Sequence, residues 1–184
     1  MGRTKALLPI GGEDTFLSRI VKTFRAAGVE DVVVVLGHDA DAIAEMLRAS
    51  EVPARIVVNS NYAAGQFSSL LAGLQLVDRP GVSGMLLTLV DVPLVSVDTV
   101  RAVVARYRTT SAPLVRPVSG ERHGHPVLID RRLFDALRRA DPAIGAKPVI
   151  RTHASATGDV PVRDEGAFTD IDTPEEYAAI ASSK

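Results

Sequence analysis

The chain has 184 residues, of which 46% are hydrophobic, and its formal net charge at pH 7 is −1. This length favours one domain with a full hydrophobic core, and the balanced charge argues against a nucleic acid or an anionic membrane as partner. The sequence has no cysteine and no apolar run long enough to cross a membrane, so we exclude disulfides and thiolate metal sites and expect a cytoplasmic protein.

The first part of the chain alternates apolar runs with amphipathic segments. Three largely apolar runs are typical of strands buried on both faces of a parallel sheet, and they cover residues 32–36, 55–58 and 85–90. Apolar stripes predict helices over residues 16–27, 43–47, 68–77 and 96–107. Gly28 suits the C-cap of the first helix, and Ser68, Ser69 and Ser96 suit helix N-termini. This alternation predicts a doubly wound α/β domain with a mostly parallel sheet.

The pattern changes after Thr110. Residues 112–130 contain two extended stretches around a polar, Gly-containing connection, which predicts a small antiparallel flap or hairpin. A helix is expected over residues 131–139, followed by a Pro- and Gly-containing segment up to Lys147. The last helix is predicted to begin after Thr173, its N-cap. Pro174 is the expected first helical residue, and Glu176 is the expected capping-box partner of Thr173. No linker or repeat divides the chain, so we expect one domain over residues 1–184.

Two aspartates fall where ligands bind in open α/β sheets, at the carboxyl ends of strands. Asp91 follows the apolar run 85–90 and is followed by Pro93, and Asp172 precedes the last predicted helix. Taken singly, Asp91 is best interpreted as a turn residue, and Asp172 as an acidic residue that a helix N-terminus favours. As a pair in this topology they suit Mg²⁺, which prefers oxygen ligands and could bridge the phosphates of a nucleoside triphosphate.

Other segments could also contact a ligand. Lys5 could reach a phosphate group, although a lysine near a terminus is more often only solvated. The segment 59–73 runs from a predicted strand through a Gly-containing loop to a helix N-terminus, which can bind anions or base edges or can simply be capped. His123 and His125 lack the third ligand that zinc requires, so we interpret their segment as a substrate-facing flap, with a polar hairpin turn as the alternative.

The order of these segments resembles that of a known family. The motifs are MGRTK, NSNYAAGQFSSL, LVDVP, GHPVLI and DIDTPEEY, and together they cover essentially the whole chain. In this order and spacing they resemble the MobA-like nucleotidyltransferases, and within that family the molybdenum cofactor cytidylyltransferases. The resemblance implies a Rossmann variant like that of the nucleotide-diphospho-sugar transferases.

The resemblance also implies roles at the nucleotide end of the site. Lys5, with Gly2 beside it, would neutralise charge on the triphosphate, and Gly65, Ser68 and Ser69 would lie against the base. The family's Gly-Met-Ser-Ser-Ser-Leu motif is replaced here by residues 65–70, Gly-Gln-Phe-Ser-Ser-Leu, which leaves the choice between CTP and GTP open.

By the same resemblance, Asp91 and Asp172 would hold Mg²⁺ and would form the catalytic group together with Lys5. The reaction implied is attack by a terminal phosphate of the acceptor on the α-phosphorus of the nucleoside triphosphate, with release of pyrophosphate. Such chemistry needs positioning and charge neutralisation, and it requires no nucleophilic side chain.

At the acceptor end, Gly124, His125 and Pro126 would face the pterin substrate. The family's Gly-Asp-x-Gly-Ala-Arg motif is present only loosely, with Asp141 displaced and Lys147 in place of the arginine. Lysine is a point charge and cannot make the bidentate contact that arginine makes with a phosphate.

The family pattern further includes an inner strand and a Gly-rich loop, Leu-Ala-Ala-Gly-x-Ser-x-Arg, ahead of the Met-Gly-x-x-Lys stretch. Only Met1, Gly2 and Lys5 of this region are present. We therefore expect that the first strand is missing and that the chain as given begins too late. Because an inner strand pairs on both sides, we also expect the chain to fold poorly or to bind nucleotide weakly.

The leading hypothesis is transfer of a nucleoside monophosphate from CTP to molybdenum cofactor, for delivery to a molybdoenzyme. The alternatives are a guanylyltransferase for the same cofactor, a cytidylyltransferase for a sugar or isoprenoid phosphate, and a non-catalytic carrier of the cofactor. A nucleic-acid-binding protein is disfavoured by the neutral charge balance.

Overall fold

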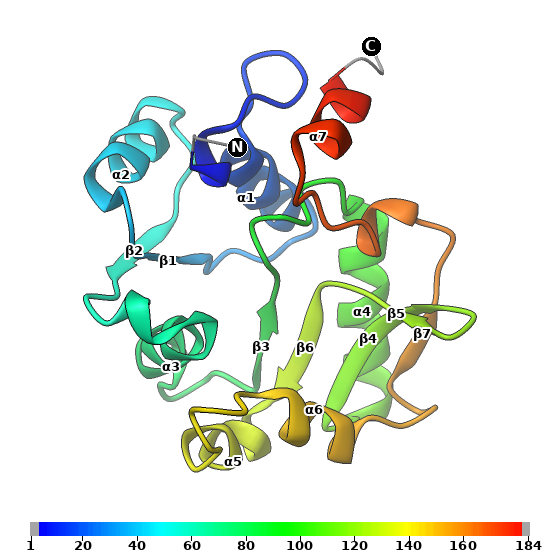
Figure 1. Ribbon diagram of the computed structural model, residues 1–184. Helices are drawn as coiled ribbons and strands as arrows, with labels where there is room; N and C mark the ends of the chain where they lie inside the picture. The colour runs from blue at the N-terminus through cyan, green and yellow to red at the C-terminus, as the bar shows by residue number, and fades with distance from the viewer. Residues whose placement is uncertain (1–3, 182–184) are drawn as a thin grey trace.

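The computed structural model of the protein describes residues 4–181 (Figure 1). Its helices, including the short 3-10 helices η1 to η4, are η1 (Lys5–Leu7), α1 (Phe16–Ala26), α2 (Ala40–Ala49), η2 (Tyr62–Ala64), α3 (Gln66–Val77), α4 (Val97–Thr110), η3 (Arg131–Leu133), α5 (Phe134–Arg138), α6 (Lys147–His153), η4 (Glu165–Ala167) and α7 (Pro174–Ala181). Its strands are β1 (Val33–Leu36), β2 (Arg55–Val58), β3 (Gly84–Leu87), β4 (Leu114–Ser119), β5 (Arg122–His123), β6 (Val127–Asp130) and β7 (Asp159–Pro161).

The strands form two sheets. Strands β1 and β2 pair in parallel, and the second sheet has the order β3-β6-β4-β5, with β7 paired to β4. In the second sheet only β4 and β7 are parallel, and the other pairs are antiparallel. The predicted α/β class, the parallel pairing of β1 with β2 and the antiparallel flap are therefore confirmed, whereas the run 85–90 does not join the parallel pair. The antiparallel part is larger than a flap, because β3 also pairs with β6.

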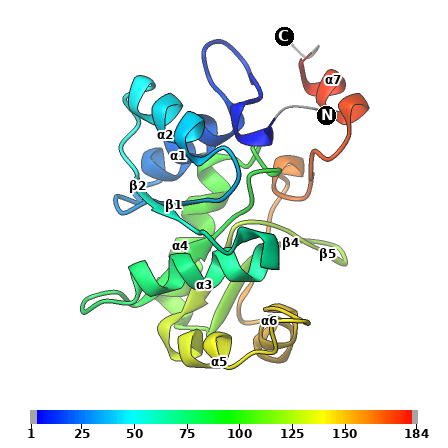
Figure 2. The ribbon, with the colours of Figure 1, turned by 60° about the vertical axis from the view of Figure 1, so that its left-hand side comes forward.

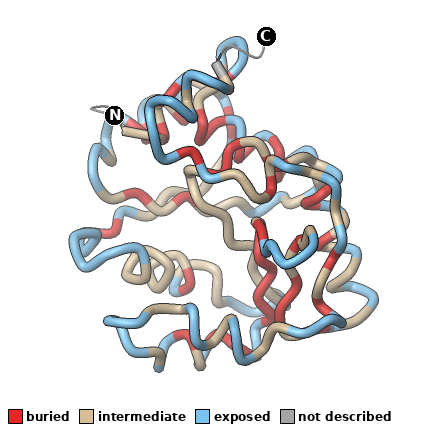
Figure 3. Tube along the Cα trace, turned by 45° about the vertical axis from the view of Figure 1, so that its right-hand side comes forward, coloured by how far each residue is buried: buried red, intermediate tan, exposed pale blue. Residues whose placement is uncertain are grey.

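Helices cover both faces of the second sheet, as Figure 2 shows. Leu114 and Ile129 face α3 and α5, whereas the next residue of β4, Val115, and the preceding residue of β6, Leu128, pack with Val103 of α4. This alternation is the period-two pattern of strands whose two faces are both covered. In Figure 3 the buried parts of the chain include much of β4 and all of β6.

The apolar runs of the first half are less buried than their composition predicts. All residues of β3 are half-buried, and Val58 at the end of β2 is 59% exposed. Among residues 4–181, no strand pairs with the second edge of β1 or of β3. Both faces of β1 are nonetheless covered, since Val34 and Leu36 pack in the core with α1 and α2 and Val35 lies against Gly73 of α3. The predicted burial on both faces is therefore confirmed only in part. Helix α3 is also less buried than its composition predicts, because it is strongly apolar but buries only Leu74.

Local capping signals account for several helix boundaries. Helix α4 begins at Ser96, whose side chain accepts a hydrogen bond from the Thr99 backbone, as predicted. The predicted capping box of α7 is also present, since the Glu176 carboxylate accepts from the Thr173 backbone and the Thr173 hydroxyl accepts from the Glu176 backbone. Helix α3, in contrast, begins two residues earlier than expected, and its N-cap is Gly65 rather than a serine.

Asp164 connects the start of α4 to the segment that leads to α7. Its Oδ2 atom accepts hydrogen bonds from the Ser96 backbone at 2.8 Å and from the Thr99 hydroxyl at 2.6 Å, and Oδ1 accepts from the Gly166 backbone at 3.1 Å. Burial alone would raise the pKa of Asp164, but these hydrogen bonds outweigh burial and hold the pKa below 3.8.

We predict that Asp164→Ala lowers the free energy of unfolding at neutral pH by about 2 kcal/mol, because it leaves buried donors without an acceptor. A lowered native pKa stabilises the fold above the ordinary value of 3.8, and this contribution is lost as the pH falls through the lowered pKa. The difference in free energy of unfolding between the unaltered chain and Asp164→Ala should therefore become smaller at acidic pH. Urea unfolding at several pH values measures it.

Asp98→Ala is the matched control, since the Asp98 side chain is 92% exposed in the first turn of the same helix. Its cost should stay below about 0.5 kcal/mol. Equal costs for the two variants would contradict the role given to Asp164.

Candidate active site

Lys5 lies between the two aspartates that the sequence paired. Its Nζ atom donates a hydrogen bond to Asp172 Oδ1 and lies 3.8 Å from Asp91 Oδ2. The backbone of η1 is held by hydrogen bonds from Leu7 to the Thr4 carbonyl and from Leu8 to the Lys5 carbonyl, both at 3.0 Å. Gly2, the other residue expected at this end, lies outside the described residues. The structure therefore brings Lys5, Asp91 and Asp172 together from three distant parts of the chain.

A backbone hydrogen bond sets the spacing of the two aspartates. The Ile171 amide donates to the Asp91 carbonyl at 2.8 Å, and the Ile171 side chain is fully buried. Val92, next to Asp91, is fully buried as well. On the other side, Glu176 accepts the backbone N–H of Asp172 at 2.8 Å, which ties that residue to the first turn of α7. Both carboxylates are thus positioned by neighbouring backbone.

The carboxylate of Asp91 is in an environment that disfavours its charge. Burial raises its pKa above 3.8, Lys5 opposes this effect, and the nearby Asp170 and Asp172 add to the increase. Oδ1 of Asp91 is buried and, like the neighbouring Thr88 hydroxyl, has no hydrogen-bond partner among residues 4–181. A carboxyl group with a raised pKa and an unused oxygen is typical of a functional site.

These residues fit a hard divalent cation. Two carboxylates are available, and the unpartnered Oδ1 of Asp91 is an oxygen that a cation would satisfy. Within the described part of the chain there is no group of three or more His, Asp or Glu side chains that could hold a metal ion by itself. Two carboxylates suit Mg²⁺ or Mn²⁺, which can complete their coordination with water and substrate phosphates.

A polar network connects the end of β2 to the start of α3. Asn59 is buried, and its Nδ2 atom donates to the hydroxyls of Ser68 at 2.8 Å and Ser69 at 3.0 Å. Ser68 in turn donates to the carbonyls of Gly65 at 2.8 Å and Asn61 at 3.0 Å. The two serines therefore hold the loop in place instead of capping the helix. Gly65, exposed and with a φ of 95°, takes a backbone conformation that suits glycine.

The flap residues lie against the segment that leads to Asp172. Gly124 is buried, and a Cβ atom there would lie 2.3 Å from the Ala167 carbonyl oxygen, so only glycine fits. The His125 backbone donates to that carbonyl at 2.8 Å, and His125 Nδ1 is 3.4 Å from the Leu87 carbonyl at the end of β3. The peptide bond between His125 and Pro126 is cis. Gly124, His125 and Pro126 are thus fixed near the chain that leaves β3 toward Asp91.

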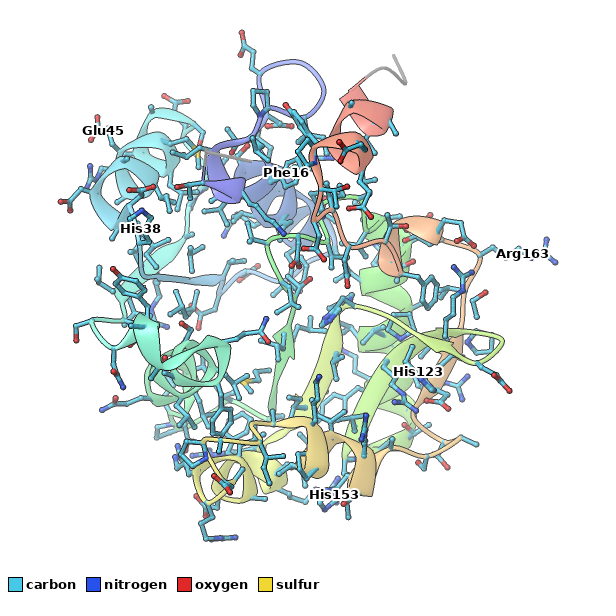
Figure 4. All side chains as sticks on the ribbon, viewed as in Figure 1. Phe16, His38, Glu45, His123, His153 and Arg163 are labelled. Atoms are coloured by element: carbon cyan, nitrogen blue, oxygen red, sulfur yellow. The ribbon has the colours of Figure 1, made fainter. Side chains whose placement is uncertain are left out.

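Ion pairs hold the tip of the flap in the same way. Arg122 makes a bidentate ion pair with Glu165 at 2.8 Å, and its guanidinium lies 4.9 Å from the ring centre of Phe168. His123 lies beside it on the exposed strand β5, on the opposite side of the molecule from His38 in Figure 4.

Asn59, Thr88 and Ile171 were not predicted from the sequence, although Asn59 ends an apolar run in the same way as Asp91.

Lys147 lies far from the cluster of Lys5, Asp91 and Asp172. It is exposed at the start of α6, at the opposite end of the molecule from η1 and α7 (Figure 1). The loop before it approaches the nucleotide side instead, since a Cβ atom on Gly145 would lie 3.7 Å from that of Phe67. A contact of Lys147 with substrate stays a prediction.

A shallow depression of about 450 Å³ on the outer side of α4 is separate from the cluster. It is lined by Ser96, Asp98, Thr99, Ala102, Val162, Arg163 and Asp164. Arg163 points into solvent (Figure 4), and Asp164 already uses both oxygens in hydrogen bonds. We assign the depression no part in the site.

We predict that Asp91→Asn raises the free energy of unfolding of the metal-free protein at neutral pH, because it removes the cost of a charged, partly buried carboxylate. A raised native pKa favours the neutral carboxyl group, so that stability is complete below 3.8 and is lost as the pH rises through the raised pKa. The higher free energy of unfolding of Asp91→Asn should therefore disappear at acidic pH. Thermal unfolding over a pH series measures it, with Asp98→Asn as the exposed control. A less stable Asn variant at neutral pH would show that attraction to Lys5 outweighs the cost of burial.

Comparison with known proteins gives consistent matches. Residues 1–157 match the family described as MobA-like NTP transferase domain. The chain is 34% identical to nicotine blue oxidoreductase of Paenarthrobacter nicotinovorans over 184 residues, which covers 94% of this chain and 85% of that protein. It is also 34% identical over 115 residues to a probable molybdenum cofactor guanylyltransferase of Rhodopirellula baltica, with 62% and 53% of the two chains covered.

A solved structure agrees with these matches. Rv0371c of Mycobacterium tuberculosis H37Rv, crystallised in complex with manganese, has a TM-score of 0.79 and 25% identity, covering 99% of this chain and 94% of that one. The structural neighbours have the nucleotide-diphospho-sugar transferase fold, which confirms the predicted Rossmann variant. Since the family match covers most of the chain, this protein belongs to the MobA-like NTP transferase family.

Proposed function

We propose that this protein is a Mg²⁺-dependent nucleotidyltransferase that moves a nucleoside monophosphate from CTP to molybdenum cofactor and releases pyrophosphate. The observation that carries the proposal is the contact of Lys5 with Asp91 and Asp172, in a chain of the MobA-like NTP transferase family. A cation between two carboxylates, beside the loop after β3, is an arrangement that can bind a phosphate group and a metal ion together.

The residues of this cluster would act through position and charge. Lys5 would contact the triphosphate and offset the negative charge that develops on the departing pyrophosphate. Asp91 and Asp172 would hold Mg²⁺, which when bound supplies Lewis-acid stabilisation of the phosphate oxygens. The acceptor phosphate is itself the nucleophile, so the protein needs to hold the reactants in line and to exclude water.

The loop at the end of β2 is the proposed contact for the nucleobase. Gly65 and Gln66 are exposed, and the loop behind them is fixed by Asn59 through Ser68 and Ser69. A fixed loop with accessible backbone groups can distinguish bases by hydrogen bonds to their edges. The name of the Rhodopirellula relative supports GTP as the alternative donor.

The flap is the proposed contact for the acceptor. Gly124, His125 and Pro126 lie beside the end of β3 and are held by the Ala167 carbonyl, so they flank the path to Asp91. We keep Lys147 as a proposed contact to a more distant acidic group of the pterin substrate. Delivery of the product to a molybdoenzyme, in the cytoplasm, belongs to the same proposal. No described helix is long and apolar enough to cross a membrane.

The name of the Paenarthrobacter relative supports a second candidate function, an oxidoreductase. That relative matches 94% of this chain, so its named activity is relevant. A hydride transfer would not require the two carboxylates to hold a metal ion. Oxidation of NADH or NADPH by an added dye, unaffected by Asp91→Asn, would favour this candidate.

The deciding experiment is pyrophosphate release by the chain, with Mg²⁺, molybdenum cofactor and either CTP or GTP. In line with the expected weak nucleotide binding, we expect slow release with CTP. Lys5→Met, Asp91→Asn and Asp172→Asn should each lower the rate by about 100-fold or more, since each removes charge stabilisation at the reacting phosphates. Lys22→Met is the matched control. Lys22 lies on α1 and makes an ion pair with Asp14, so this variant removes a lysine–aspartate ion pair outside the cluster.

Each outcome of this assay has a separate meaning. Release with GTP alone would correct the donor and keep the reaction class. Release with a sugar or isoprenoid phosphate in place of the pterin would correct the acceptor. Full activity of the Asp91 and Asp172 variants would overturn the assignment of the site. Binding of the cofactor without any pyrophosphate release, unchanged in Asp91→Asn, would favour a carrier.

A further inference from the structure

Lys5 occupies the position at which the proposed function requires a divalent ion. Its Nζ atom donates to Asp172 Oδ1 and is 3.8 Å from Asp91 Oδ2, so one ammonium group serves as counterion to both carboxylates. A divalent ion that contacts both aspartates would lie within a few ångströms of that ammonium. Two cations at this separation repel each other strongly, even where water screens them.

The two carboxylates do not need Lys5 to stay together. Their spacing is set by the 2.8 Å hydrogen bond from the Ile171 amide to the Asp91 carbonyl, and Ile171 is fully buried. Glu176 independently holds the backbone of Asp172 and Thr173, at 2.8 Å in each case. The carboxylate pair therefore exists before any cation binds, and it should survive removal of the lysine.

The side chain of Lys5 can move while its backbone stays fixed. The backbone of η1 is hydrogen-bonded, and the next residue, Ala6, is buried against the core formed by α1 and α2. The Lys5 side chain itself is 28% exposed, and Asp172 is 62% exposed, so the ammonium group can leave through the open side of the cluster. The four-carbon side chain of lysine allows such a movement at low cost.

From these contacts we propose that Lys5 is an exchangeable internal counterion that competes with the divalent ion for Asp91 and Asp172. Binding of the metal ion displaces the ammonium group, which then becomes available to the triphosphate. The inference rests on the proposed function, because it takes these aspartates as the metal ligands. It implies that the protein alone binds metal weakly, and that a ligand able to attract Lys5 strengthens metal binding.

Binding of Mn²⁺ in the absence of nucleotide tests this competition. Free Mn²⁺ is measured by electron paramagnetic resonance for the unaltered chain and for Lys5→Met, Lys5→Gln and Lys22→Met. We expect the two Lys5 variants to bind Mn²⁺ about tenfold more tightly, although both lose turnover. Lys22→Met should bind Mn²⁺ like the unaltered chain, and Asp91→Asn added to Lys5→Met should remove the gain.

Circular dichroism and thermal unfolding show which variants are folded, and the use of two Lys5 variants keeps the test available if one is not. Equal or weaker Mn²⁺ binding by a folded Lys5 variant, with binding still abolished by Asp91→Asn, would overturn the competition and leave the metal site intact. Mn²⁺ binding that ignores Asp91→Asn in every background would overturn both the competition and the metal ligands of the proposed function.

Discussion

The hydrogen bond from the Ile171 amide to the Asp91 carbonyl is the contact on which the rest of the site depends. It joins the segment that follows β3 to the segment that precedes α7. The Ile171 side chain packs with Leu8, Ile10 and Phe16. Full burial of one such side chain stabilises a fold by about 1.5–3 kcal/mol. The same small core therefore joins residues 8–16, the segment that follows β3 and residues 171–180, and these regions adjoin or contain Lys5, Asp91 and Asp172.

The electrostatics of the cluster oppose stability. Burial and two neighbouring carboxylates raise the pKa of Asp91, and one of its oxygens has no partner within residues 4–181. Lys5 relieves part of this cost without removing it. Concentrated charge of one sign is typical of sites that bind an oppositely charged ligand, where local stability is lower in the absence of that ligand. The cluster makes physical sense as a site prepared for a cation and for phosphate groups.

The candidate site lies where the two sheets of the molecule meet. The parallel pair β1–β2 supplies Asn59 and the loop to Gly65, and the five-stranded sheet supplies Asp91 and the flap around His125. Ligands of open α/β folds bind at such a place, beyond the carboxyl ends of the strands. Strand β3 and helix α3 lie at the same junction of the two sheets. Both are largely half-buried, because their apolar surface is incompletely covered in the described part of the chain.

Local patterns determined much of the architecture from the sequence alone. The β-branched runs specified β1 and β2, the capping residues Ser96 and Thr173 specified the starts of α4 and α7, and the alternation of strands and helices specified the α/β class. Helix α6 was not predicted. Its first turn contains Pro148, and proline is tolerated there because no hydrogen bond from its nitrogen is needed.

The sequence also paired Asp91 with Asp172 by placing both at strand ends. The pairing is confirmed, but the placement is not, because β3 ends at Leu87 and β7, the last described strand before Asp172, ends at Pro161. The sequence could not show that Lys5 bridges them, that Asn59 organises the serines, or that Ile171 sets the spacing. These contacts join residues far apart in the chain and depend on the packing of several elements. Local periodicity, by itself, determined most of the elements and the class of the fold. Only the tertiary structure decided which charges meet, because a charge acts over a few ångströms of space regardless of its position in the sequence.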